Sequence, residues 1–82
     1  MSAVKINLIR VNLNAGNVTL ACHIALLDSI EYDKVVNLDN AYAKVRERVT
    51  PTQWRSALAV LAKQGKYQSM SGEFNGSYGT LI

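Results

Sequence analysis

Residues 50–65, TPTQWRSALAVLAKQG, decide the fold because they carry the clearest local signals in the chain. Thr50 is a favourable N-cap, and Pro51 suits the first helical position, where its missing N–H costs nothing. Gln53 completes a capping box with Thr50. Gly65 favours the left-handed conformation that ends many helices. The stretch therefore predicts a helix that begins at Pro51 and stops before Gly65.

A helical wheel of this segment separates a core face from a polar face. At about 100° per residue, one side gathers apolar residues, namely Trp54, Ala57, Leu58 and Leu61. The opposite side gathers small or polar residues, namely Thr52, Ser56, Ala59 and Lys63, with Gln53 and Arg55 on its flanks. We expect the first set to be buried and the second to face solvent or a partner.

A second helix is predicted directly upstream. Apolar residues recur there at the spacing of one helical face, at Leu38, Ala41, Tyr42, Val45 and Val49. We predict a helix from Leu38 to about Val49, with Asn37 or Asp39 as its N-cap. A short strand at Val35-Val36 precedes it.

Residues 18–31 fit two patterns. Apolar residues alternate as in a strand, but Leu20, Ile24 and Leu27 also form a helical stripe. The alanines and leucines favour a helix, and Asn17 would be its N-cap. We predict the helix and keep the strand as the alternative.

The two ends of the chain are predicted to be extended. Val4–Leu13 is rich in β-branched residues, and its asparagines disfavour a helix, so we predict a strand followed by a turn at residues 14–17. After Gly65, strands at 67–70 and 77–82 flank a glycine-containing turn or loop at 71–76. The carboxyl-terminal third therefore predicts a β-hairpin.

Composition limits the class of protein. A chain of 82 residues, 49% hydrophobic and 18% charged, predicts one folded domain over residues 1–82. One cysteine, Cys22, excludes an internal disulfide, and with His23 it cannot supply the roughly four ligands of a structural zinc site. No apolar run approaches the ~18–20 residues of a membrane span. We expect a cytoplasmic protein with no metal, cofactor or membrane partner.

Charge is unevenly distributed along the chain. Residues 1–40 hold three basic and four acidic side chains, whereas residues 41–82 hold six basic and two acidic ones. A basic half indicates an anionic partner, and nucleic acid is the commonest. Motifs of enzymes, such as a glycine-rich phosphate loop or a Gly-x-Ser-x-Gly nucleophile turn, are missing from the sequence. We therefore predict a binding protein rather than an enzyme.

The predicted order from residue 18 is helix, short strand, helix, tight turn, capped helix and β-hairpin. It resembles the winged helix-turn-helix family of DNA-binding domains over residues 18–82. Residues 38–67, LDNAYAKVRERVTPTQWRSALAVLAKQGKY, carry the likeness: a helix ending at an apolar residue, Thr-Pro, a helix with a basic residue and two leucines, then glycine before the wing. The resemblance implies an α+β fold of three helices and a carboxyl-terminal wing, to which residues 1–13 add an amino-terminal strand.

The resemblance also implies a function. It predicts a small, sequence-specific regulator of transcription or replication, of a phage or plasmid type, that binds double-stranded DNA through a recognition helix at about residues 51–64. In the major groove, Gln53 can pair with adenine and Arg55 with guanine, while Thr52, Ser56 and Ala59 allow close approach. Phosphate contacts are expected from basic side chains, namely Lys44, Arg46, Arg48, Lys63 and Lys66.

We expect a homodimer, because one recognition helix reads only a few base pairs, and we assign residues 1–13 as the pairing strand. The competing prediction is a winged-helix-like protein-interaction module, such as a phage-type inhibitor or adaptor of a larger nucleic-acid enzyme. It is favoured by the wing, whose only charged residue is Glu73.

Several residues have simpler structural interpretations. We expect Trp54 and Cys22 in the core and His23 at least half-buried, and Arg55 is as well explained by a solvated helix flank. Asp28, Glu31 and Asp33 are expected to form a solvated helix end rather than a metal site.

Overall fold

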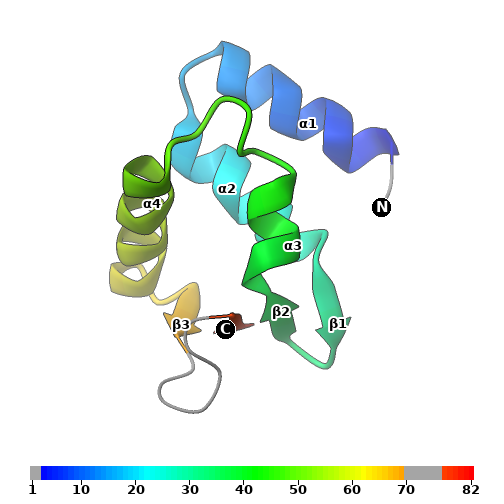
Figure 1. Ribbon diagram of the computed structural model, residues 1–82. Helices are drawn as coiled ribbons and strands as arrows, with labels where there is room; N and C mark the ends of the chain where they lie inside the picture. Colours follow the sequence, from blue (N-terminus) through cyan, green and yellow to red (C-terminus); the bar gives the residue numbers. More distant parts are fainter. Residues whose placement is uncertain (1–2, 70–76) are drawn as a thin grey trace.

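The computed structural model describes residues 3–69 and 77–82. These residues form a small α+β fold of four helices and one four-stranded antiparallel sheet (Figure 1). The α+β class predicted from the sequence is confirmed, but the number of helices is larger than predicted.

The amino-terminal segment is a helix, α1 (Ala3–Asn14), so the predicted strand at residues 1–13 is wrong. Ile6, Ile9 and Leu13 recur at helical spacing, and Ile9 is buried in the core. The Asn12 side chain donates to the carbonyl of Leu8 at 2.8 Å, within the helix. Packing on the next helix therefore outweighs the strand preference of the β-branched residues. The turn predicted at residues 14–17 is confirmed, and Gly16 adopts φ +82° in it.

Residues 18–27 form helix α2 (Val18–Leu27), so the predicted helix is confirmed over the alternative strand. The helix ends four residues earlier than predicted. Asn17 occupies the N-cap position but makes no side-chain capping bond. Beyond Asp28, the Ser29 hydroxyl donates to the Ala25 carbonyl, and the chain turns into a strand. Strands β1 (Ile30–Tyr32) and β2 (Val35–Asn37) then form a short hairpin.

The sheet joins this hairpin to the carboxyl-terminal one. Strands β3 (Tyr67–Ser69) and β4 (Tyr78–Leu81) are paired, which confirms the predicted hairpin, and the order across the sheet is β1-β2-β4-β3. Met70 and the predicted turn at 71–76 lie outside the described residues. Gly79 is required beneath the ring of Tyr67, because a Cβ there would lie 2.3 Å from the ring's Cε1.

Helix α3 (Leu38–Ala43) is shorter than the predicted helix to Val49. Asn37 is its N-cap, accepting from the Asn40 N–H at 3.1 Å. After Ala43 the chain continues in turns, and the Tyr42 hydroxyl donates to the Val49 carbonyl at 2.7 Å. This bond draws the chain back across the end of α3 and sets the direction of the next helix.

Helix α4 (Pro51–Lys63) matches the prediction closely. Both bonds of the Thr50–Gln53 capping box are present, at 3.1 and 2.9 Å. Gln64 is the C-cap, and Gly65 adopts φ +74°.

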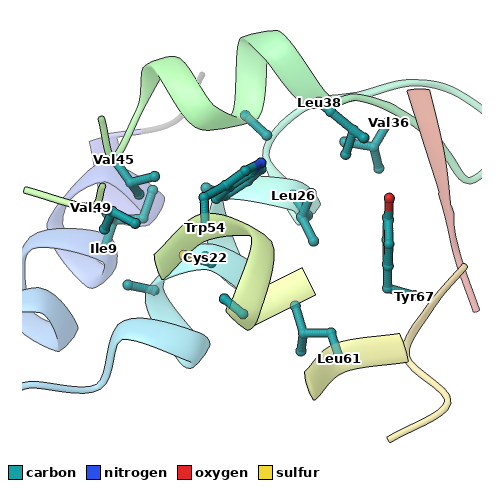
Figure 2. Close-up of a cluster of buried hydrophobic side chains, with 14 of the residues drawn as sticks. Ile9, Cys22, Leu26, Val36, Leu38, Val45, Val49, Trp54, Leu61 and Tyr67 are labelled. Carbon is teal, nitrogen blue, oxygen red and sulfur yellow. The ribbon is translucent and has the colours of Figure 1, made fainter. Parts of the chain in front are cut away.

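The core lies where α2, α3, α4 and the sheet meet. Figure 2 shows Trp54 in the middle of it, with Ile9, Val45 and Val49 to one side and Tyr67 to the other. Cys22 and Leu26 of α2 are fully buried in the same cluster. This arrangement fixes one side of α4 against the core and turns the other side outward.

Candidate nucleic-acid interface

The candidate site is the outward face of α4. Trp54, Ala57 and Leu61 are buried, and Leu58 packs against the core. The Trp54 ring also contacts the Tyr42 ring, with centroids 5.2 Å apart. The core face predicted from the helical wheel is therefore confirmed. The residues predicted for the opposite face are all exposed, namely Thr52, Gln53, Arg55, Ser56, Ala59 and Lys63.

The turn between α3 and α4 holds two further cations at the amino-terminal end of this face. Arg46 and Arg48 are both exposed. The Arg48 guanidinium donates to the Asn14 side-chain oxygen at 2.6 Å, so it lies close to the end of α1. At the other end of α4, Lys66 is exposed just beyond the last turn. The structure thus places cations at both ends of α4.

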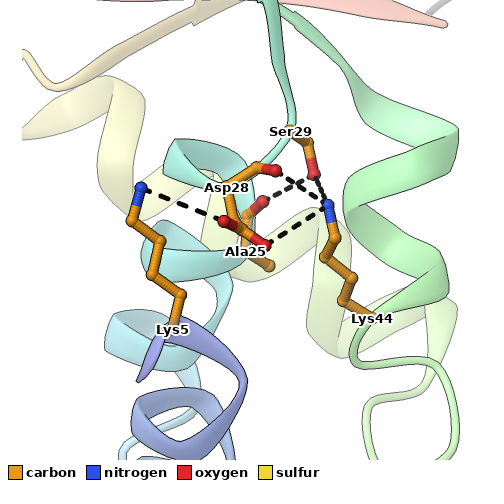
Figure 3. Close-up of polar contacts among 5 residues, drawn as sticks. All are labelled: Lys5, Ala25, Asp28, Ser29 and Lys44. Carbon is orange, nitrogen blue, oxygen red and sulfur yellow. Dashed lines mark hydrogen bonds and ion pairs between the residues drawn. The ribbon is translucent and has the colours of Figure 1, made fainter. Parts of the chain in front are cut away.

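Lys44 differs from the other predicted phosphate contacts because its ammonium group points into the protein (Figure 3). It donates to the Asp28 carbonyl at 3.0 Å and to the Ser29 hydroxyl, and it lies 3.8 Å from the Asp28 carboxylate. Only 8% of the Lys44 side chain is exposed. Burial lowers the pKa of Lys44, an effect that the Asp28 charge opposes and the Lys5 charge reinforces. Lys44 therefore ties α3 to the end of α2 instead of facing a ligand.

Asp28 was expected in a solvated helix end, and that prediction is wrong. Its side chain is only 7% exposed and lies between two ammonium groups, with Lys5 of α1 at 3.9 Å on one side and Lys44 on the other. Glu31 and Asp33 are exposed, as expected. Nothing in the local sequence identifies Asp28 as buried, since its partners are 23 and 16 residues away. The three charged residues join α1, α2 and α3.

Three acidic residues lie outside α4 and the turn before it, whereas Glu47 is exposed in that turn, between Arg46 and Arg48. Glu31 and Asp33 belong to the β1–β2 hairpin, Asp39 to the first turn of α3, and α4 itself contains no acidic residue. Figure 1 shows α4 and the β1–β2 hairpin on opposite sides of the molecule. The charge imbalance along the sequence therefore becomes an imbalance across the fold.

Cys22 and His23 have no arrangement suited to catalysis. Cys22 is fully buried, and burial raises the pKa of its thiol to about 11, so it is not a nucleophile at neutral pH. His23 is half-buried, as expected, and burial together with the Lys66 charge lowers its pKa. Within residues 3–69 and 77–82, no three His, Cys, Asp or Glu side chains are grouped to hold a metal ion. No helix in the same ranges is long and apolar enough to cross a membrane.

One feature near the site was missed from the sequence. A groove of about 450 Å³ runs between α1 and the α3–α4 turn, with Ile6, Ile9 and Leu13 along one wall and Arg10 and Arg48 among its polar residues. It was missed because it exists only if residues 3–14 are helical. The spacing of Ile6, Ile9 and Leu13 was the available signal.

No model of a protein family, no curated protein and no solved structure matches the chain.

Proposed function

We propose that this chain is a winged helix-turn-helix protein that binds double-stranded DNA and regulates transcription or replication. Support comes from the order α2-β2-α3-α4-β3-β4, in which a capped helix follows the turns of residues 44–50 and leads directly into a hairpin. Strand β2 pairs with the last strand, β4, and so joins that hairpin to the helices. Helix α1 and strand β1 are additions to this arrangement.

The observation that carries the proposal is the outward face of α4. Thr52, Ser56 and Ala59 are small and exposed, so the helix backbone can approach the floor of a major groove about 12 Å wide. Gln53 and Arg55 flank these residues and have the planar donor groups that pair with adenine and guanine. We propose that these five residues read the base pairs.

Exposed cations around α4 would hold the DNA backbone. Arg46 and Arg48 precede α4, while Lys63 and Lys66 lie at its carboxyl-terminal end. Such contacts position a protein on DNA without reading sequence. Lys44 is left out of the proposed set, because its ammonium group is already bonded inside the protein.

The test is fluorescence anisotropy with duplex DNA at two salt concentrations, with sites selected from a random library. We expect Arg55→Ala to cost about 1–3 kcal/mol on the selected site and to relax preference at one position. Lys63→Ala should weaken selected and random DNA alike and reduce the salt slope by about one. Absence of duplex binding by the wild type below about 100 μM at about 50 mM salt would refute the proposal.

The second candidate is a protein-interaction module that uses the same face. It is favoured by Val60, an exposed apolar residue one turn from both Ser56 and Lys63. A protein partner would gain from covering Val60, and binding would depend only weakly on salt. Steep loss of binding with rising salt is expected for DNA instead.

A further inference from the structure

The groove between α1 and the α3–α4 turn combines an apolar floor with cationic side chains. Its volume is about 450 Å³, within the range of about 300–1,000 Å³ that is typical of sites for small molecules. Such sites are lined mainly by apolar side chains, with a few polar groups that orient the ligand. No residue of α4 lines the groove, so it is separate from the face proposed to read base pairs.

The apolar part of the groove has a defined length. Ile9 and Val45 are only 4% and 2% exposed, and Leu13 is partly buried against the same core. Ile6 of α1 and Ala43, the last residue of α3, extend this lining. Since Ile6 and Leu13 are seven residues apart in one helix, the apolar wall is about 10 Å long. An extended chain of about eight carbons has this length, because each carbon adds about 1.3 Å.

Two arginines lie near the carboxyl-terminal end of α1. Arg10 and Asn14 are four residues apart, so their side chains share one face of this helix. The Arg48 guanidinium, which comes from the other side of the groove, donates to the Asn14 Oδ1 at 2.6 Å. This bond holds Arg48 next to the helical face that carries Arg10. Two guanidinium groups are therefore brought to the same end of the groove.

Both arginines retain hydrogen-bond donors for a ligand. Arg10 is exposed and makes no hydrogen bond or ion pair with any residue in the ranges 3–69 and 77–82. The bond to Asn14 uses one of the five N–H donors of Arg48. Guanidinium groups bind carboxylates through short, charge-assisted hydrogen bonds that fix the orientation of the anion.

The charges along the groove favour a ligand with a single negative charge. Lys44 also lines the groove, but its ammonium group is bonded to Asp28 and Ser29 inside the protein. Two arginines and one acidic residue, Glu47, remain, so the free charges give 2 − 1 = +1. One carboxylate neutralises this charge, whereas a doubly charged phosphate would exceed it.

We propose that this groove binds a carboxylate with an unbranched apolar chain of about eight carbons. Arg10 and Arg48 donate to the carboxylate at one end. The chain covers Ile6, Ile9 and Leu13 and removes the exposed part of their surface from water.

Arg48 connects the groove to DNA binding. It is also among the cations proposed to hold the DNA backbone, so a bound carboxylate competes with a phosphate for its donors. We expect the carboxylate to weaken DNA binding, and DNA to weaken carboxylate binding by the same factor. This competition rests on the proposed function, whereas occupancy of the groove does not.

Titration of the full chain with sodium octanoate, without DNA, tests the binding through proton–nitrogen correlation spectra. The backbone amide signals of residues 6–14 and 40–48 should shift, with a dissociation constant of about 0.1–1 mM. From hexanoate to octanoate, each added CH₂ should tighten binding about fourfold, and chains longer than about ten carbons should gain little more. Octanol has the same chain without the charge and should bind at least about tenfold more weakly.

A pair of charge-matched variants locates the carboxylate. Arg10→Gln removes one guanidinium group from the groove and should weaken octanoate binding at least about tenfold. Lys34→Gln removes the same charge from the turn of the β1–β2 hairpin, outside the groove, and should bind octanoate as the wild type does. Both side chains are exposed, so both variants should fold. If Arg10→Gln does not fold, the comparison of octanoate with octanol on the wild type decides.

Three results would each overturn the inference: no shifts at about 5 mM octanoate, equal affinities for octanoate and octanol, or equal losses in the two variants. Affinity that continues to rise well beyond about ten carbons would also overturn it, because a groove of limited length cannot hold the added chain. Octanoate binding by a protein that does not bind DNA would refute only the proposed function. DNA binding by a protein that does not take up octanoate would refute only the groove ligand.

Discussion

Lys44 and Arg46 are two residues apart and carry the same charge, but the fold gives them opposite surroundings. The Lys44 ammonium group is enclosed by Asp28 and Ser29, whereas Arg46 is exposed. The sequence predicts phosphate contacts for both, because the partners of Lys44 are about 15 residues distant. The burial of Trp54 is predictable because the relevant pattern lies within one helix. At this scale, local periodicity is predictable from the sequence and long-range pairing is not.

Lys44→Met and Arg46→Met should therefore have different consequences. Loss of Lys44 leaves Asp28 with the more exposed Lys5 alone, and we expect unfolding to become easier by about 2–4 kcal/mol in urea titrations. Arg46→Met should change stability by less than about 0.5 kcal/mol but lower the salt slope of DNA binding by about one. Equal stability of the two variants would mean that the Lys44 bonds contribute nothing to the fold.

Among the elements, α4 was the most predictable and α1 the least. Residues 50–53 signal the start of α4, and Gly65 signals its end. The bounds of this helix can therefore be predicted without knowledge of the rest of the fold. Residues 3–14 contain no comparable start signal, and their β-branched residues and asparagines favoured a strand; their helical state depends on packing against α2. The end of α3 was overestimated for the same reason, because the Tyr42–Val49 bond that redirects the chain is not a local signal.

The capping box gives a prediction for α4 as an element. Thr50→Ala removes the acceptor for the Gln53 N–H, and we expect a loss of about 0.5–2 kcal/mol. A loss of about 1 kcal/mol corresponds to roughly 4–8 °C in melting temperature for a domain of this size. Thr52→Ala is the matched control, since Thr52 is exposed in the same helical turn, and it should melt within about 0.5 kcal/mol of the wild type. Identical melting of both alanine variants would contradict the role of the cap.

For the molecule as a whole, the positions of the charged residues affect ligand binding at α4 more than the net charge does. The net charge is only +3, and the acidic residues of the β1–β2 hairpin lie across the sheet from the strand that follows α4. Strands β1 and β3 are three spacings apart, or about 14 Å. This exceeds the Debye length of about 10 Å at 0.1 M salt, so charges on the hairpin are largely screened from a ligand on α4. The sequence revealed that the charge was uneven, but only the fold shows which surfaces carry it.

Two charge-reversal variants distinguish DNA binding at α4 from a general attraction of DNA to a cationic protein. Lys63→Glu and Lys34→Glu each lower the net charge by two, but Lys63 lies on α4 and Lys34 in the turn of the β1–β2 hairpin. Both side chains are exposed, so both variants should fold. At about 0.1 M salt we expect Lys63→Glu to weaken binding to random duplex DNA at least about tenfold, and Lys34→Glu less than about twofold. Similar losses would assign the affinity to net charge alone, and a larger loss for Lys34→Glu would move the interface to the hairpin. Because the two variants have the same net charge, a difference in their affinities reports the position of the DNA.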